Sequence, residues 1–306
     1  MTIEKSQTSV AGPAVRPGVR AGVYRRTPRA HRIRGSRPGL GTYLTLGLLL
    51  FLSAFPLYWS VVVASQDESA IAKSPPTVVP GPHLWEHIRT AFQQANFGLA
   101  LVNSAIVCTV ITVCVLLTST LAGFAFSRLR FRGREALLGF IVGTMLIPTQ
   151  LGVIPLYIMV TRWFGWTNDI RAVIVPTLVS AFGVFFMRQY LVAALPIDLI
   201  EAGRVDGAST LRLYWNIVLP VARPAVAVLG LLTFIMTWND LFWPLIVLNS
   251  QNPTVQVAIS SLAAGVTVDY SLTLTGAVIG TFPILIVFVL LGRQIVGGIM
   301  QGAVKA

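Results

Sequence analysis

The sequence predicts an all-α membrane protein with six transmembrane helices, and three observations support this fold class. The chain has 306 residues, of which 55% are hydrophobic and only 11% are charged, whereas a soluble domain carries about 25% charged residues. Six apolar runs are each long enough to cross a hydrocarbon core of about 30 Å. The basic residues are concentrated in alternate connecting segments, as in multi-pass membrane proteins.

Residues 1–39 precede the first apolar run and hold nine of the 23 Lys and Arg residues. Because they show no apolar periodicity, we expect a disordered, basic cytoplasmic tail near anionic membrane lipid. RNA binding is the alternative, but few aromatic residues interrupt the arginines, so we expect no nucleic-acid partner. The first run, 40–65, is longer than a signal-peptide core of about 7–15 residues, which favours a retained helix.

Five further runs complete a predicted transmembrane domain over residues 40–306. Prolines interrupt the third and fourth runs at Pro148, Pro155 and Pro176. Such breaks are tolerated where neighbouring helices or a cavity satisfy the freed backbone groups. They indicate either irregular helices around a pathway or kinked structural helices. The five runs lie at about 101–127, 136–160, 172–195, 222–248 and 273–292.

The distribution of basic residues predicts the orientation of the chain. Nineteen of the 23 Lys and Arg residues lie in the tail, in 128–134, in 188–223 and in the last 14 residues. Since positive charge stays on the cytoplasmic side, we expect both termini and the 196–221 segment to be cytoplasmic.

A short stretch, His83-Leu84-Trp85-Glu86-His87, matches a metalloprotease pattern in which two histidines share a metal. Five residues match easily by chance, and the only other histidine is His31 in the tail. We therefore expect a surface helix that docks on the membrane, with no metal ligand and no catalytic residue. The sequence also lacks a Walker A phosphate-binding loop, so we expect no bound cofactor.

Asn103, Asn239 and Asp240 are the polar candidates for lining a pathway. An acidic residue in a membrane helix is costly and is often functional. Counted from Ala222, however, Asp240 lies about 27 Å along a helix, so an aromatic-rich interface is the favoured alternative. Asn103 could equally serve a contact between helices.

The stretch 199–220 is polar and regularly spaced, although it lies between two apolar runs. Asp198 is placed to cap a helix that begins near Leu199, and Gly207 permits a left-handed turn. A second short helix is expected from about Ser209, ended by Pro220. Its apolar stripe would consist of Leu211, Tyr214, Trp215 and Val218. Two short helices joined by a glycine make a compact knob that can enter a groove on a soluble partner, and an amphipathic loop on lipid headgroups is the alternative.

This spacing resembles the EAA loop in the membrane subunits of ABC importers. The family pattern is Glu-Ala-Ala, three residues, Gly, nine residues, Ile, any residue, Leu-Pro, and this chain departs from it only at Gly203. Over residues 40–306 the chain also looks like the second permease of maltose-type sugar importers, which implies a type I ABC importer permease fold. That likeness rests on Asn103-Ser104, Ala125-Phe126-Ser127-Arg128, Trp238-Asn239-Asp240, Trp243-Pro244-Leu245 and Gly302-Ala303-Val304-Lys305.

The resemblance implies a non-enzymatic permease subunit that forms half of a pathway for a di- or oligosaccharide in the plasma membrane. It implies a heterodimer with a second permease, two subunits that bind ATP and Mg, and an extracytoplasmic solute-binding protein. In relatives the last outer loop reaches the binding protein, which here points to Gln256, Ser260 and Ser261. The residues expected at the ATPase surface or in the turn into the fifth span are Glu201, Ala202, Gly203, Asp206, Gly207, Ile217, Leu219 and Pro220.

We expect an alternating-access mechanism in which closure of the ATPase pair moves this loop and opens the membrane helices outward. The nearest alternative is an ABC importer permease for amino acids, phosphate or metals. A stand-alone channel or secondary transporter would usually show paired ionisable residues at the midplane or inverted repeats, and neither is clear in this sequence.

Overall fold

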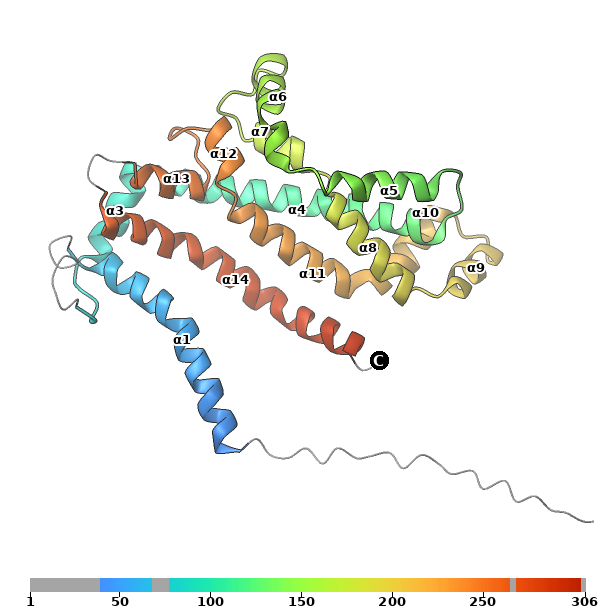
Figure 1. Cartoon of the computed structure of the whole chain (residues 1–306), viewed down its shortest axis with the longest axis horizontal. Helices are drawn as coiled ribbons and strands as arrows, with labels where there is room; N and C mark the ends of the chain where they lie inside the picture. The colour runs from blue at the N-terminus through green and yellow to red at the C-terminus, as the bar shows by residue number, and fades with distance from the viewer. Residues whose placement is uncertain (1–38, 68–76, 265–267, 304–306) are drawn as a thin grey trace, which may run out of the picture. The chain divides into compact units, whose positions relative to one another are not determined.

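The computed structural model describes residues 39–67, 77–264 and 268–303 (Figure 1). The basic tail expected over 1–39 lies outside the described residues up to position 38, as do residues 304–306. The chain divides after Leu49 into two units, so the first ten residues of helix α1 belong to one unit and all later elements to the other.

Almost all of the described chain is helical and none of it forms a strand, which confirms the all-α fold class. Most elements are α-helices; η1 and η3 are short 3-10 helices, and η2 and η4 are π-helical segments. The elements are α1 (Leu40–Ser65), α3 (Leu84–Gln94), α4 (Phe97–Arg128), α5 (Arg134–Thr144), η1 (Thr149–Gly152), α6 (Val153–Ile158), η2 (Met159–Trp163), α7 (Arg171–Ile174), η3 (Val175–Thr177), α8 (Ala181–Ala194), α9 (Ile197–Val205), α10 (Thr210–Leu213), η4 (Tyr214–Val218), α11 (Leu219–Trp238), α12 (Phe242–Val247), α13 (Val255–Leu262) and α14 (Tyr270–Ala303).

Five helical stretches among these residues are long and apolar enough to cross a membrane, and a bent pair of helices can supply a sixth. The bent pair is Arg134–Thr144 with Thr149–Trp163, and its two parts differ in direction by 88°. The break falls just before Pro148, because a residue that precedes proline is driven out of the helical region. The other five stretches are Leu40–Ser65, Phe97–Arg128, Arg171–Ala194, Thr210–Trp238 and Tyr270–Leu290.

The fifth predicted span, 222–248, is not one helix in the structure. Helix α11 ends at Trp238, and the short helix α12 follows after a turn. The Asn239 amide donates to the carbonyl of Ile235 at 2.8 Å, and the Asp240 carboxylate accepts from the backbone N–H of Phe242 at 3.1 Å. These side chains compete with the backbone for hydrogen bonds and end the helix. At its other end the apolar stretch begins at Thr210, earlier than predicted.

Helix α4 is the central element and packs along both α8 and α11 (Figure 1). Its crossing with α8 is close because small residues meet there. A Cβ atom added to Gly123 would lie 2.7 Å from the Met187 Cβ and 2.9 Å from the Arg188 backbone nitrogen. Gly183 of α8 likewise lies against Ser119. In a membrane the hydrophobic effect does not drive helices together, and small residues let them approach closely enough for van der Waals packing.

The two ends of α4 lie in two different hydrophobic cores. We call them the Asn96 end and the Arg128 end, after the residue before the helix and its last residue. At the Arg128 end a hydrophobic core joins α4, α8, α9, η4 and α11. At the Asn96 end a second core joins α3, α4, α13 and α14. A functional site at either end therefore rests on several helices at once.

Candidate functional site

The knob expected from the 199–220 spacing consists of α9, a tight turn, α10 and η4, and it lies at the Arg128 end of α4. Helix α9 begins one residue after Pro196, whose extended backbone (ψ 143°) starts the helix. Asp198 therefore lies in the first helical turn and does not cap the helix, which corrects the sequence prediction. A carboxylate in the first turn still suits the positive helix end. Glu201 follows one turn later and is exposed.

The turn after α9 is a Schellman motif built around Gly207. Gly207 has φ +76°, a conformation that glycine adopts without the steric cost of a Cβ atom. The Ala208 N–H bonds to the Gly203 carbonyl at 2.9 Å, and the Gly207 N–H bonds to the Arg204 carbonyl at 3.0 Å. These two bonds satisfy carbonyls that the helix end would leave free. The glycine predicted for the turn is thus required by the backbone.

The second half of the knob is continuous with the fifth membrane helix. The Ser209 hydroxyl caps α10 by accepting from the Arg212 N–H at 3.3 Å. α10, η4 and α11 then follow without a gap from Thr210 to Trp238. Pro220 does not end a helix here, contrary to the sequence prediction. A π-helical segment precedes it, and such a segment shifts the hydrogen-bond register where a proline lacks its N–H.

The predicted apolar stripe of this second helix is divided between two faces. Tyr214 and Val218 are fully buried, but Leu211 is 64% exposed and Trp215 is 51% exposed. The buried face includes Leu213, which the sequence analysis did not select. Leu211 and Trp215 are therefore on the surface of the knob.

The buried face of this second half attaches the knob to α4. The Tyr214 hydroxyl and the Thr120 hydroxyl are 2.6 Å apart in a buried hydrogen bond. The Tyr214 ring also lies against Phe124 with centroids 6.4 Å apart. A buried bond between two hydroxyls is worth about 1 kcal/mol net and leaves an unsatisfied group when one partner is removed.

Arg128 holds the entry to the knob, and the sequence analysis did not assign it that role. Its guanidinium Nη2 donates to the carbonyls of Leu191 at 3.0 Å and Val192 at 2.9 Å, and also to that of Leu195. These carbonyls close α8 just before Pro196. A positive charge at a helix C-terminus satisfies free carbonyls and complements the helix dipole. Since Arg128 is the last residue of α4, it ties two membrane helices together where the knob begins. An arginine at the end of an apolar run was the signal available in the sequence.

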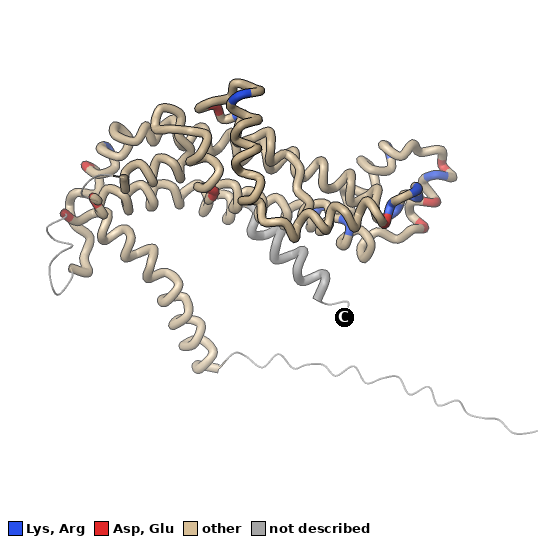
Figure 2. Tube along the Cα trace, turned by 45° about the horizontal axis from the view of Figure 1, so that its top comes forward, with Lys and Arg blue, Asp and Glu red and all other residues tan. Residues whose placement is uncertain are grey.

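The predicted ATPase-contact residues divide into an exposed set and a packing set. Gly203, Ile217 and Leu219 are half-buried, while Pro220 is exposed beside the membrane helix. None of the ion pairs among the described residues involves Glu201 or Asp206. Figure 2 shows charged residues of both signs gathered at the end of the unit that carries the knob. The exposed set on the knob is Glu201, Ala202, Asp206 and Gly207.

Gly203, the one departure from the EAA pattern, faces the chain's own core. A Cβ atom at this position would overlap the Leu213 side chain and lie 3.4 Å from the Ile217 Cδ1. The small residue therefore makes room for the Leu213 side chain of the same chain.

This contact predicts that Gly203→Ala changes the thermal stability in opposite directions in two backgrounds. We expect Gly203→Ala to lower the thermal stability of the purified protein, because the new methyl group overlaps Leu213. In a Leu213→Ala background the overlap is gone, and the same substitution should stabilise α9 by about 1 kcal/mol through helix propensity. The measurement is the midpoint of heat-induced loss of folded protein for the four members of the double-mutant cycle. Equal effects of Gly203→Ala in both backgrounds would contradict this packing.

The three pathway candidates lie outside the knob. Asn103 is buried (5% exposed) and donates to the Asn252 Oδ1 at 2.7 Å and to the Pro253 carbonyl at 3.0 Å. Asn239 and Asp240 form the turn after α11, and partial burial raises the pKa of the Asp240 carboxyl. Each side chain thus has a local structural contact, and a pathway role for them stays a prediction.

The residues predicted to contact a binding protein lie on a helix, where the sequence analysis expected a loop. In α13 the buried side chains Val255, Ala258 and Leu262 face α4 and α14. Gln256 and Ser260 are half-buried on the other side, and Ser261 is exposed. Val257 is buried as well (3% exposed), so Ser261 alone of the predicted set is fully exposed on this short helix at the Asn96 end.

The histidine pattern serves local packing. The His87 Nδ1 is 2.8 Å from the Ala64 carbonyl, and the His83 Nδ1 is 3.3 Å from the Glu86 Oε2. The two rings lie with centroids 6.1 Å apart. No group of three His, Cys, Asp or Glu side chains in the described ranges could hold a metal ion.

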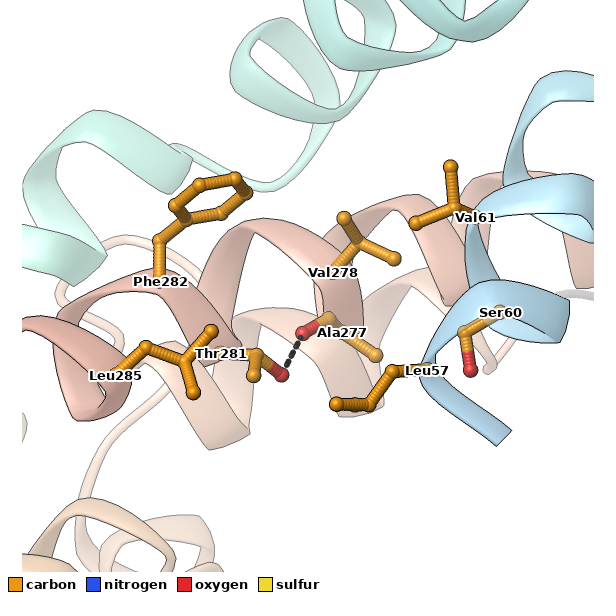
Figure 3. A pocket seen from close by; sticks show the side chains of 8 residues that line it. All are labelled: Leu57, Ser60, Val61, Ala277, Val278, Thr281, Phe282 and Leu285. Carbon is orange, nitrogen blue, oxygen red and sulfur yellow. Dashed lines mark hydrogen bonds between the residues drawn. The ribbon is translucent and has the colours of Figure 1, made fainter. Parts of the chain in front are cut away.

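An apolar groove lies between α1 and α14 and has a volume of about 180 Å³ (Figure 3). Its two hydroxyls bond to backbone carbonyls within their own helices, Ser60 to Pro56 and Thr281 to Ala277, each at 2.8 Å. A sugar needs several convergent polar groups, so this groove does not suit one. Its lining side chains are Leu57, Ser60, Val61, Ala277, Val278, Thr281, Phe282 and Leu285.

Comparison with known proteins decides the family. Residues 115–297, more than half of the chain, match the family described as binding-protein-dependent transport system inner membrane component. The chain belongs to this family. A family member is a transport component of the inner membrane and not an enzyme, and it acts in a transport system that also uses a binding protein.

Individual relatives agree with this assignment. The chain is 34% identical to the lactose transport system permease protein LacG of Rhizobium radiobacter, and the match covers 89% of this chain and 98% of that protein. It is 31% identical to the sn-glycerol-3-phosphate transport system permease protein UgpE of Yersinia pestis, and the match covers 84% of this chain and 94% of that protein. A crystal structure of a bacterial ABC transporter involved in the import of the acidic polysaccharide alginate matches the fold with a TM-score of 0.71 at 21% identity, covering 83% of this chain and 95% of that one.

Proposed function

We propose that this chain is the permease subunit of an ATP-driven, binding-protein-dependent importer of a di- or oligosaccharide, and that it forms half of the translocation pathway. The lactose permease relative supports the sugar class. The sn-glycerol-3-phosphate permease relatives favour a small phosphorylated polyol as the second candidate. The identity of the sugar would follow from the ligand of the binding protein.

One observation carries the coupling part of the proposal: the second half of the exposed knob is a direct extension of a membrane helix. Glu201 and Asp206 are exposed carboxylates outside the ion pairs described above, and Val205 next to them is 88% exposed. An exposed mixture of acidic and large apolar groups suits a protein partner. Because α10, η4 and α11 are continuous, a displacement of the knob is passed to the membrane without a flexible joint.

The proposed partners follow from this role. A second permease completes the pathway, two ATPase subunits hold ATP and Mg, and a solute-binding protein delivers the sugar on the far side. Both termini and the coupling loop, 196–221, are cytoplasmic in this proposal, and the tail of residues 1–39 lies near anionic lipid. Closure of the ATPase pair moves the knob inward and biases the membrane helices toward the outward-open state.

Co-purification tests the proposal. A tagged chain expressed in its host membrane should retain an ATPase and a second permease, and ATP hydrolysis should rise when the loaded binding protein is added. Recovery of the tagged chain alone, with solute uptake that does not need ATP, would show a stand-alone transporter.

Gly207 offers a sharper prediction for the same role. Nothing lies within 4 Å of a Cβ atom built at this position, so the cost of a side chain comes from the left-handed backbone, about 1–2 kcal/mol. We expect Gly207→Val to reduce ATPase recovery and sugar uptake about tenfold, and Gly207→Asn to keep most of both because Asn tolerates this conformation. The readout is the ratio of ATPase to permease after purification. Equal recovery for the two variants would contradict a role for the turn geometry.

A further inference from the structure

A cluster of asparagines joins three segments at the Asn96 end of α4. The Asn252 Nδ2 donates to the Asn168 carbonyl at 2.9 Å, and the Asn252 Oδ1 accepts from the Asn103 amide at 2.7 Å. A single side chain therefore links the segment between α12 and α13 both to α4 and to the segment before α7. Asn103 lies in a predominantly apolar helix, and this contact satisfies its amide.

Asn168 holds the second connection of the cluster. Its N–H donates to the Val247 carbonyl and its Oδ1 accepts from the Asn249 N–H, both at 3.0 Å. Asn168 has φ +57°, a left-handed conformation that asparagine tolerates better than most residues. The geometry thus uses both the backbone preference and the side chain of an asparagine.

The cluster leads directly into α13. The N–H of Val255, the first residue of that helix, donates to the Ser104 hydroxyl at 2.8 Å in a buried bond. Ser104 is next to Asn103 on α4, so the start of α13 is fixed to α4 by two neighbouring side chains. The accessible side of α13 carries Gln256 and Ser260.

We infer that Asn252, through its bonds to the Asn103 side chain and to the Asn168 carbonyl, is a positioning residue that makes α13 and the end of α4 move as one body when a binding protein docks on α13. This inference rests on the proposed importer function and adds the residues that receive the docking signal. From Asn103 the rigid helix α4 continues for about 25 Å to Thr120, which bonds the knob through Tyr214. A contact on α13 is therefore joined by one helix to the surface proposed for the ATPase.

The test separates signal reception from folding by measuring two parameters. The complete transporter is placed in lipid nanodiscs, and its ATPase rate is followed against the concentration of the solute-binding protein encoded in the same operon, purified with the sugar it carries. For Asn252→Ala we expect the half-saturating concentration to rise about fivefold, as for the loss of two partly buried hydrogen bonds. The basal rate and the maximal rate should stay near those of the unaltered transporter.

A second variant and two glycine controls complete this test. Ser104→Ala removes the buried bond to the Val255 N–H at 2.8 Å, so it should also raise the half-saturating concentration. Asn168→Gly keeps the left-handed backbone and removes only the exposed bond from the Asn249 N–H, so it should leave the concentration unchanged. Asn96 has the same backbone conformation (φ +48°), and its amide makes an exposed bond to the Ser250 carbonyl at 3.0 Å. Asn96→Gly should leave the concentration unchanged, because exposed bonds compete with water.

The outcomes distinguish this inference from the proposed function. If the unaltered transporter is not stimulated by the binding protein, the proposed function fails and this inference fails with it. If stimulation is normal and both Asn252→Ala and Ser104→Ala have the half-saturating concentration of the unaltered protein, or lower only the maximal rate, this inference alone is overturned. Should Asn252→Ala prevent assembly of the complex, Ser104→Ala decides.

Discussion

Glu201→Lys is expected to abolish binding of the ATPase while the permease still inserts into the membrane. Glu201 is exposed, and none of the ion pairs in the described part of the chain involves it, so its charge is available to a partner. Reversal of a charge in such a contact replaces attraction by repulsion and costs several kcal/mol, on the order of 2–5. That cost corresponds to a loss of affinity of more than tenfold. The measurements are ATPase recovery with the tagged permease and sugar uptake by whole cells.

The matched control is Glu86→Lys, the same charge reversal on an exposed residue of α3. Glu86 lies near the Asn96 end, away from the knob, so ATPase recovery should remain normal. Equal amounts of both variants in the membrane fraction exclude a failure of insertion. Normal uptake by the Glu201→Lys strain would end the coupling proposal, because a docking carboxylate cannot be reversed without effect.

The spacing of Glu201, Gly207 and Pro220 was sufficient to locate the knob, and composition was sufficient to predict the membrane fold. Both predictions depend on local rules: a left-handed turn requires glycine, and a bilayer requires about 20 apolar residues. The structure has φ +76° at Gly207. Local rules succeed where a residue's own backbone or solvent decides its position.

The predictions that depended on tertiary packing were less accurate. Helical periodicity grouped Leu211 and Trp215 with Tyr214, but only Tyr214 has a buried partner, the Thr120 hydroxyl. The same periodicity cannot tell which apolar face meets α4 and which remains exposed. The role of Asn252 was equally hidden, since its partners are 84 and 149 positions away in the chain.

Pro220 shows how a local rule can be overridden. Proline ends helices because it lacks a hydrogen-bond donor, and the sequence analysis ended the second short helix there. In the structure the π-helical segment Tyr214–Val218 precedes it, and α11 starts at Leu219. The burial of Tyr214 and Val218 keeps the chain helical across this point. The helical stretch from Thr210 to Trp238 is therefore longer than the sequence predicted.

Gly123→Leu is expected to have the largest effect on the fold itself. A Cβ atom here would lie 2.7–2.9 Å from Met187 and from the backbone at Arg188, so α4 and α8 would have to separate. Forcing extra methylene groups into a packed core typically costs about 1–3 kcal/mol, and more where backbone must move. Separation would also displace Arg128 from the carbonyls at the end of α8, which hold the entry to the knob.

The control uses the same substitution at Gly139 in helix α5, where nothing lies within 4 Å of an added Cβ atom. We expect Gly139→Leu to leave the amount of folded protein unchanged, and Gly123→Leu to reduce it severalfold after extraction and gentle heating. Gly123→Ala should lie between them, since its methyl group meets the same backbone atoms without the rest of the leucine side chain. If Gly123→Leu matched Gly139→Leu in folded yield and in ATPase recovery, α4 and α8 would not be in close contact. The route from α4 to the knob would then have to run through Tyr214 alone.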